Sequence, residues 1–98
     1  MAEPIPCEQT REVTVEVGVY DPVRGLARTW PQDYSLSFDV TPHGDVVIRG
    51  DKAGLRGLAT QLLALAESDV PPRFHFRIDD FMLELDRGSM PVRIEQRD

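Results

Sequence analysis

The sequence predicts an α+β fold, a two-layer sandwich in which one helix packs on one face of a mostly antiparallel sheet. Two observations support this fold class. Apolar and polar residues alternate in short segments on both sides of one segment with helical periodicity, in the order β-β-β-α-β-β. The polar positions of the alternating segments would leave the other sheet face in water, as antiparallel sheets commonly do. We therefore expect about four to six strands and one helix.

The first expected strand covers residues 11–20, where β-branched residues alternate with polar ones at a period of two. Its apolar face consists of Val13, Val15, Val17 and Val19. Residues 34–40 form the next strand, with the inward positions Tyr34, Leu36, Phe38 and Val40. Turn-forming residues at 41–45 lead into a strand over 46–49, with Val46 and Ile48 inward. The short connection predicts an antiparallel hairpin.

The single helix is expected over residues 52–68, with Asp51 as its N-cap. Its apolar stripe, expected to face the sheet, consists of Leu55, Leu58, Ala59, Leu62, Leu65 and Ala66. The residues expected to face away are Arg56, Thr60, Gln61 and Glu67. Gly54 and Gly57 weaken the helix by about 1 kcal/mol each relative to Ala, but they let its first turn approach the sheet closely. Val70-Pro71-Pro72 ends the helix.

Alternation returns in the last third of the chain. One face carries Phe74, Phe76 and Ile78, and the other carries His75, Arg77 and Asp79. An additional short strand is expected near residues 81–86, where Phe81, Leu83 and Leu85 alternate with Met82, Glu84 and Asp86. A turn at 87–89 precedes a closing strand marked by Val92 and Ile94.

Length and composition limit the organisation of the chain. The 98 residues correspond to one domain. Residues 1–10 contain Pro4 and Pro6 and show little periodicity, so we expect a flexible N-terminal arm followed by a single domain over residues 11–98. The only cysteine, Cys7, lies in this arm, and we expect it to be an exposed, incidental thiol.

Charge and hydropathy argue against several functions. The chain has 11 Lys+Arg and 17 Asp+Glu, a formal net charge of −6, which disfavours nucleic-acid binding because phosphates are repelled. No apolar run reaches the roughly 20 residues of a membrane span, and the N-terminus lacks the regions of a signal peptide. A lone cysteine can form neither an internal disulfide nor a zinc-binding pair, so we expect a cytoplasmic protein.

No pattern predicts catalysis, a metal or a cofactor. His75 and Asp79 share one side of a strand, but a metal site requires three converging ligands. The serines lie in no nucleophile elbow, and the glycines of the helix lack the context of a phosphate-binding loop. We therefore expect a protein without enzymatic activity. A small metal- or ligand-binding enzyme that uses His75, Asp79 and Glu84 stays open as an alternative.

The connection over residues 21–33 is the most informative segment for binding. A loop of this length is uncommon in a compact domain. It contains the only tryptophan, Trp30, together with Arg24 and Arg28, and Trp and Arg are enriched at binding hot spots. The alternative interpretation is that Trp30 and Leu26 fold back to close the core.

The second half of the chain resembles the predicted immunity protein 32 family of bacterial polymorphic toxin systems. The resemblance covers residues 46–98 and rests on the helix, the break after it and the strand that follows. These features are Gly50 and Asp51, the helix from Gly54-Leu55 to Leu65-Ala66, Val70-Pro71, and the strand with His75 and Asp79. The chain departs from the family pattern in two places: Arg77 stands in place of a second histidine, and apolar Phe81-Met82-Leu83 stands in place of a polar loop.

The resemblance implies a cytoplasmic α+β inhibitor that binds and neutralises a cognate protein toxin in the producing cell. An acidic inhibitor suits a basic target. We expect the partner-binding residues in the 21–33 loop and on the polar strand faces: Arg24, Arg28, Trp30, Asp39, His75, Asp79, Asp80 and Glu84. The alternative function is a self-associating accessory or structural domain, a homodimer formed through a sheet edge or an open sheet face.

Overall fold

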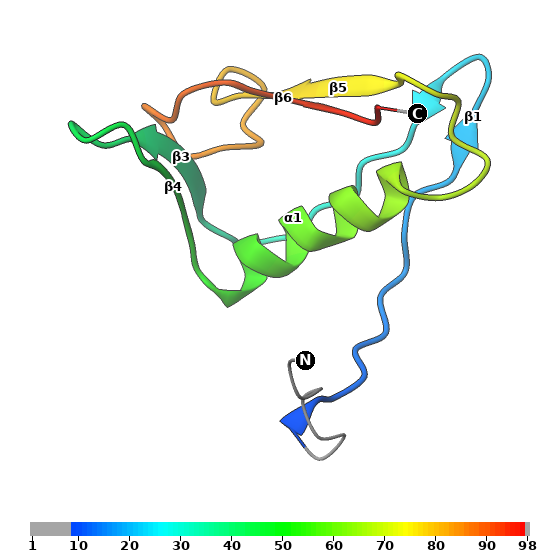
Figure 1. Ribbon diagram of the computed structural model, residues 1–98, viewed down its shortest axis with the longest axis horizontal. Helices are drawn as coiled ribbons and strands as arrows, with labels where there is room; N and C mark the ends of the chain where they lie inside the picture. The colour runs from blue at the N-terminus through cyan, green and yellow to red at the C-terminus, as the bar shows by residue number, and fades with distance from the viewer. Residues whose placement is uncertain (1–8, 98) are drawn as a thin grey trace, which may run out of the picture.

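A computed structural model describes residues 9–97, so the expectations for Cys7 and for most of the N-terminal arm lie outside the described residues. The described part contains one helix, α1 (Lys52–Leu65), and three two-stranded antiparallel sheets (Figure 1). These pair β1 (Tyr20–Asp21) with β2 (Gly25–Leu26), β3 (Leu36–Val40) with β4 (Val46–Gly50), and β5 (His75–Ile78) with β6 (Val92–Glu95). The α+β class with one helix is confirmed, but the expected sheet is divided into three small ones.

The expected antiparallel hairpin is confirmed as β3–β4, and the turn that joins the two strands contains glycine at the position that requires it. Phe38 pairs with Ile48 and Val40 with Val46, and Gly44 adopts a φ of 89° in the turn, a conformation that favours glycine. The other edge of β3 is covered by the segment 86–90. The Asp86 N–H donates to the Leu36 carbonyl over 2.8 Å, and the Met90 N–H donates to the Phe38 carbonyl over 3.0 Å. This segment connects the hairpin to the β5–β6 pair.

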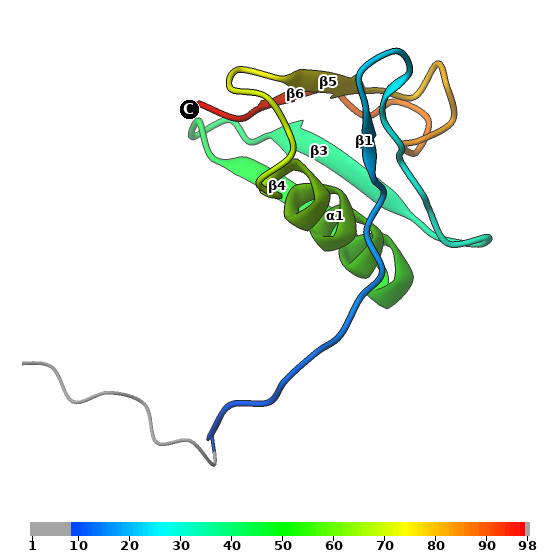
Figure 2. The ribbon, with the colours of Figure 1, turned by 90° about the vertical axis from the view of Figure 1, so that its right-hand side faces the viewer.

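Residues 11–19 do not form the expected strand, because β1 begins only at Tyr20. Val13 and Val19 are both 70% exposed, and Val17 alone of the four valines packs against the core. Alternating β-branched residues favour an extended backbone, but a strand also requires a free edge beside it. Here residues 11–15 extend away from the rest of the molecule (Figure 2).

The helix begins at its predicted N-cap, where Asp51 Oδ1 accepts the Gly54 N–H over 2.7 Å. It ends at Leu65, three residues earlier than expected. Its predicted orientation was wrong on both flanks. Leu55 and Leu62, expected inward together with Ala59 and Ala66, are 45% and 43% exposed. The buried positions are Gly54, Gly57, Leu58, Gln61, Ala64 and Leu65.

Close backbone packing explains this rotation. A Cβ atom added to Gly54 would lie 2.0 Å from the Ser35 carbonyl oxygen, and one added to Gly57 would lie 2.8 Å from the Trp30 ring. The helix therefore turns its small residues toward the segment 29–35. Gln61, expected in solvent, is 1% exposed and donates its amide to the Thr29 and Gly57 carbonyls, which satisfies the buried polar group.

The core lies between the hairpin, α1 and the β5–β6 pair, which enclose it from three sides (Figure 1). Leu36 and Ile78 are completely buried, and Phe38 and Phe76 are 5% exposed. Two expectations near the core were wrong. Val46 and Ile48 of β4 are half exposed because α1 does not cover their end of the hairpin. Residues 81–86 form a turn and a bend in place of a strand. No helix among residues 9–97 has the length and apolar character needed to cross a membrane.

Candidate functional site

Three of the predicted site residues meet in one partly buried network, although they come from segments far apart in the sequence. Arg28 donates two hydrogen bonds to the Glu84 carboxylate, over 2.7 and 3.2 Å, and the Trp30 indole N–H donates to the same carboxylate over 2.9 Å. The Glu84 side chain is only 12% exposed. Arg28 also lies over the Phe76 ring, 5.2 Å from its centroid. The network therefore ties the 21–33 loop to the segment before β6.

Tyr34 extends this network. Its ring stacks on Trp30 with the centroids 5.1 Å apart, and its hydroxyl donates to the Glu84 carbonyl over 2.7 Å. Burial raises the pKa of Tyr34 above its usual value, and the carboxylates of Glu84 and Asp86 raise it further because a phenolate would be repelled by them. Nothing in this cluster activates a nucleophile or a general base. Its geometry indicates that Trp30 holds the loop against the core.

Removing the charge of Glu84 tests the network. Glu84→Gln should lower the free energy of unfolding by roughly 1.5–3 kcal/mol. The half-buried Arg28 loses its anionic partner, and the new amide N–H group faces the N–H donors of Arg28 and Trp30. Urea unfolding measures the change. The matched control is Glu95→Gln in the exposed Arg93–Glu95 pair, which should cost no more than about 0.5 kcal/mol. Equal losses in the two variants would contradict the assigned role of Glu84.

The pKa of Tyr34 predicts a second measurable effect. The native phenol keeps its proton to higher pH than the unfolded one, so its contribution to stability is complete below about pH 10 and is lost as the pH rises through the folded pKa. In an alkaline titration followed by tyrosinate absorbance, Tyr34→Phe should remove a step above pH 10. An unchanged titration curve would contradict the assigned environment.

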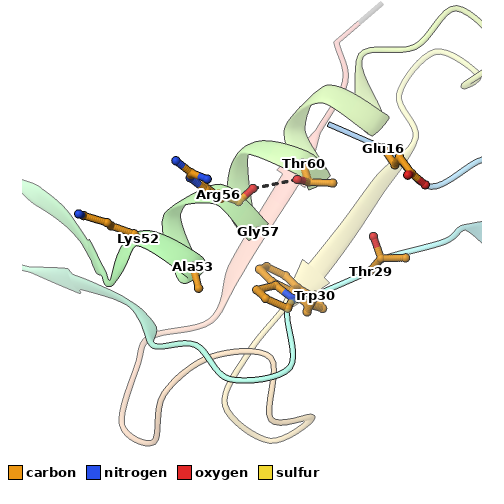
Figure 3. Close-up of a pocket in the computed structure, with 9 residues that line it drawn as sticks. Glu16, Thr29, Trp30, Lys52, Ala53, Arg56, Gly57 and Thr60 are labelled. Carbon is orange, nitrogen blue, oxygen red and sulfur yellow. Dashed lines mark hydrogen bonds between the residues drawn. The ribbon is translucent and has the colours of Figure 1, made fainter. Parts of the chain in front are cut away.

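An open groove lies between the first half of α1 and residues 29–31 (Figure 3). Its volume is about 590 Å³, and Trp30, Lys52, Arg56 and Glu16 are among the residues that line it. Among residues 9–97, Lys52 and Arg56 have no ion-pair partner. The groove is open to solvent, so its shape suits a contact surface. Within the same residues, no three His, Cys, Asp or Glu side chains converge on a point where a metal ion could bind.

The segment from Asp80 to Leu83, which we call the apolar loop, presents a different kind of surface. Phe81 and Leu83 are each 84% exposed and Met82 is 67% exposed. The loop is nevertheless held firmly at its base. Asp79 Oδ1 accepts the Met82 N–H over 3.0 Å, the Asp79 carbonyl accepts the Leu85 N–H over 3.0 Å, and Asp80 Oδ2 accepts the Gly88 N–H over 3.0 Å.

The backbone of the apolar loop includes an uncommon conformation. Leu83 has a φ of 64°, in the left-handed region, which costs a residue with a Cβ atom roughly 1–2 kcal/mol.

Asp79 and Asp80, which were predicted to contact a partner, accept hydrogen bonds from this loop. The three apolar residues were missed because alternation suggested a buried strand. The available signal was the departure from the polar loop of the resembled family.

The remaining predicted site residues lie elsewhere. Arg24 is exposed in the turn between β1 and β2, where its N–H donates to Asp21 Oδ1 over 3.1 Å. Asp39 lies on β3 and faces Arg49 of β4 over 3.9 Å. His75 is exposed on β5, and its Nδ1 lies 3.5 Å from the Arg93 guanidinium. The expected polar surface is thus divided among separate sheets.

Comparison with known proteins identifies one family. The model of the family described as Immunity protein 32 matches residues 45–97, more than half of the 98-residue chain. The match covers β4, α1, β5, the apolar loop and β6, whereas the loop that carries Trp30 lies before it. No curated protein and no solved structure shows a significant match. The chain therefore belongs to the immunity protein 32 family.

Proposed function

We propose that this protein is a non-catalytic immunity protein that binds and neutralises a cognate toxin protein in the bacterium that produces both. Membership of the immunity protein 32 family supports this function in general terms. The observation that carries the proposal for this chain is the apolar loop, which exposes Phe81, Met82 and Leu83 side by side.

Exposure of three consecutive large apolar residues is costly unless a partner covers them. Contiguous apolar surface on a small protein marks an interaction site more often than isolated apolar residues do. Asp79 and Asp80 accept hydrogen bonds from the Met82 and Gly88 N–H groups, which fixes the loop before binding, so little conformational entropy is lost when a partner docks. A loop that is held in place by hydrogen bonds and exposes an aromatic residue has the properties of a binding hot spot.

The charge of the chain indicates the chemistry of the partner. A formal net charge of −6 accelerates encounter with a basic protein and repels acidic ones. We therefore propose a toxin domain with a basic surface around an apolar depression that receives Phe81. The association rate should fall as salt is added, because screening weakens long-range attraction between the two proteins.

The experiment begins with the tagged protein in the producing strain. A co-purified polypeptide is identified, its toxin domain is expressed alone in a recipient bacterium, and growth is measured with and without this protein. The domain should arrest growth, and co-expression should restore it through a stoichiometric complex. An unrelated toxin of similar potency, which should not be neutralised, is the control. A captured domain that is harmless, or whose toxicity persists in the complex, would contradict the proposal.

Self-association is a second candidate, and one observation favours it. Val46 and Ile48 of β4 and Leu55 and Leu62 of α1 are apolar and 43–62% exposed on neighbouring elements. The apolar loop precedes the segment 86–90, which lies along β3 on the edge opposite β4. Toxin binding at the loop and self-association at β4 would therefore use different surfaces.

A further inference from the structure

The second surface is an apolar area next to an unpaired strand edge. We call it the open face and define it by Val46 and Ile48 of β4 and Leu55 of α1. Leu55 lies next to β4, because its Cγ atom is 3.5 Å from the position of a Cβ atom added to Gly50. Among residues 9–97, β4 forms its ladder with β3 alone, so its outer edge is free of strand partners. A partner that adds a strand there would cover the open face at the same time.

The chain also contains a strand-like segment without a sheet. Residues 11–15, which we call the arm, have the sequence Arg-Glu-Val-Thr-Val, with alternating β-branched apolar residues. Val13 is 70% exposed, Val15 is half-buried, and the arm runs outward from the molecule (Figure 2). A segment of high strand propensity outside any sheet and an unpaired strand edge are complementary in backbone hydrogen bonding.

The arm cannot reach β4 of its own chain in an extended form. Glu16, which follows the arm, lines the groove together with Thr60, on one flank of α1 (Figure 3). Leu55 and the open face lie on the other flank, about 140° around the helix from Thr60 at 100° per residue. For a helix about 10 Å across, half the circumference is roughly 15 Å, the length of about five extended residues. This path would use the whole arm before Val13 reached Ile48.

The register of pairing follows from side-chain chemistry. In an antiparallel arrangement that places Val13 opposite Ile48, Val15 lies opposite Val46, and all four side chains point to the open face. The same register places Glu12 opposite Arg49. The Arg49 side chain is 72% exposed, and its ion pair with Asp39 is long, at 3.9 Å. A parallel arrangement that pairs Val13 with Val46 and Val15 with Ile48 places Glu12 opposite Asp45, and like charges opposite each other are destabilising.

From these observations we infer that a second copy of this chain covers the open face, adding its arm as a strand antiparallel to β4, with Val13 opposite Ile48 and Glu12 opposite Arg49. Each copy gives its arm to the other, so the dimer is two-fold symmetric and both open faces are covered. The inference does not depend on toxin binding.

Sedimentation equilibrium of the purified protein tests the dimer. The mass should approach twice the 11.1 kDa of one chain as concentration rises. Val13→Asp should raise the dimer dissociation constant at least tenfold, because it places a charge on the covered face. Val23→Asp, at a site 91% exposed in the β1–β2 turn, is the matched control and should leave the constant unchanged. A chain that stays monomeric up to about 0.5 mM would overturn the inference.

The register is tested by charge reversal and by disulfide trapping. Glu12→Arg and Arg49→Glu should each weaken the dimer, and the double variant should restore it. In a Cys7→Ser background, a Val13→Cys chain mixed with an Ile48→Cys chain should form a disulfide-linked pair, since opposed antiparallel residues have suitable Cα separations. A Val23→Cys chain replaces the first partner as control. Two outcomes would overturn the proposed arm exchange. One is a dimer that persists in Val13→Asp while the mixed cysteine variants form no disulfide. The other is a disulfide that forms within a single chain carrying both Val13→Cys and Ile48→Cys.

Discussion

Phe81→Asp is expected to weaken the complex with the toxin at least about 100-fold while leaving the fold intact. Phe81 is 84% exposed in the free protein, so its replacement removes little packing, and surface substitutions commonly change stability by less than about 0.5 kcal/mol. In the complex the same residue would be buried, and a carboxylate in an apolar pocket costs well over 2 kcal/mol. Isothermal calorimetry with the purified toxin domain and thermal unfolding measure the two quantities.

Two further variants sharpen this prediction. Val23→Asp introduces the same charge at another exposed apolar position, in the β1–β2 turn, and should leave toxin affinity within about twofold because it alters only long-range electrostatics. Leu83→Gly should reduce affinity while stability is unchanged or up to about 1 kcal/mol higher, since glycine relieves the positive φ. Full toxin affinity in Phe81→Asp would show that the apolar loop is not the binding surface.

Gly54→Ala should destabilise the fold by about 3 kcal/mol or more, although alanine is the better helix former by about 1 kcal/mol. The added Cβ atom would lie 2.0 Å from the Ser35 carbonyl oxygen, which is backbone and cannot rotate away. Relief requires that α1 moves off the segment 29–35, which would also disturb the amide contacts of Gln61. For a domain of this size the loss corresponds to a fall in Tm on the order of 15 °C.

Ala59→Gly is the matched control for Gly54→Ala. Ala59 is exposed in the same helix, so the reverse exchange should cost only the difference in helix propensity, about 1 kcal/mol. Chemical denaturation followed by far-ultraviolet circular dichroism gives both values. A stabilised Gly54→Ala protein would contradict the close approach of α1 to Ser35.

The features that could be predicted from the sequence depend on groups a few residues apart. Asp51 caps α1 because its carboxylate reaches the Gly54 N–H three positions later. The turn around Gly44 joins β3 to β4 because glycine adopts a positive φ without strain. Gly54 and Gly57 were expected to let the first turn of α1 approach the sheet, but the segment that they approach is 30–35, which precedes β3. For the helix cap and the hairpin turn, the atoms that determine the structure lie within a few residues of one another in the sequence.

The candidate site was less predictable. Arg28, Trp30 and Glu84 were each selected as candidate contact residues, with closure of the core as the alternative for Trp30. In the structure, Glu84 accepts hydrogen bonds from the other two at a separation of 54 to 56 positions. The apolar loop was predicted as a strand because Phe81, Leu83 and Leu85 alternate with other residues. Of these three, only Leu85 is buried, at 4% exposure. Periodicity reports which residues would share a face, but it does not report whether another element covers that face.

Local features of the fold could be predicted from the sequence, whereas features that depend on long-range packing could not. The class of the fold, the hairpin, the start of the helix and the acidic character of the surface follow from local propensity and composition, which every residue carries with it. The orientation of α1, with Gln61 buried and Leu55 exposed, follows from contacts with residues 29–35. Such contacts have energies comparable to several residues of helix propensity, so long-range packing overrides the local preference and determines which side chains meet a partner.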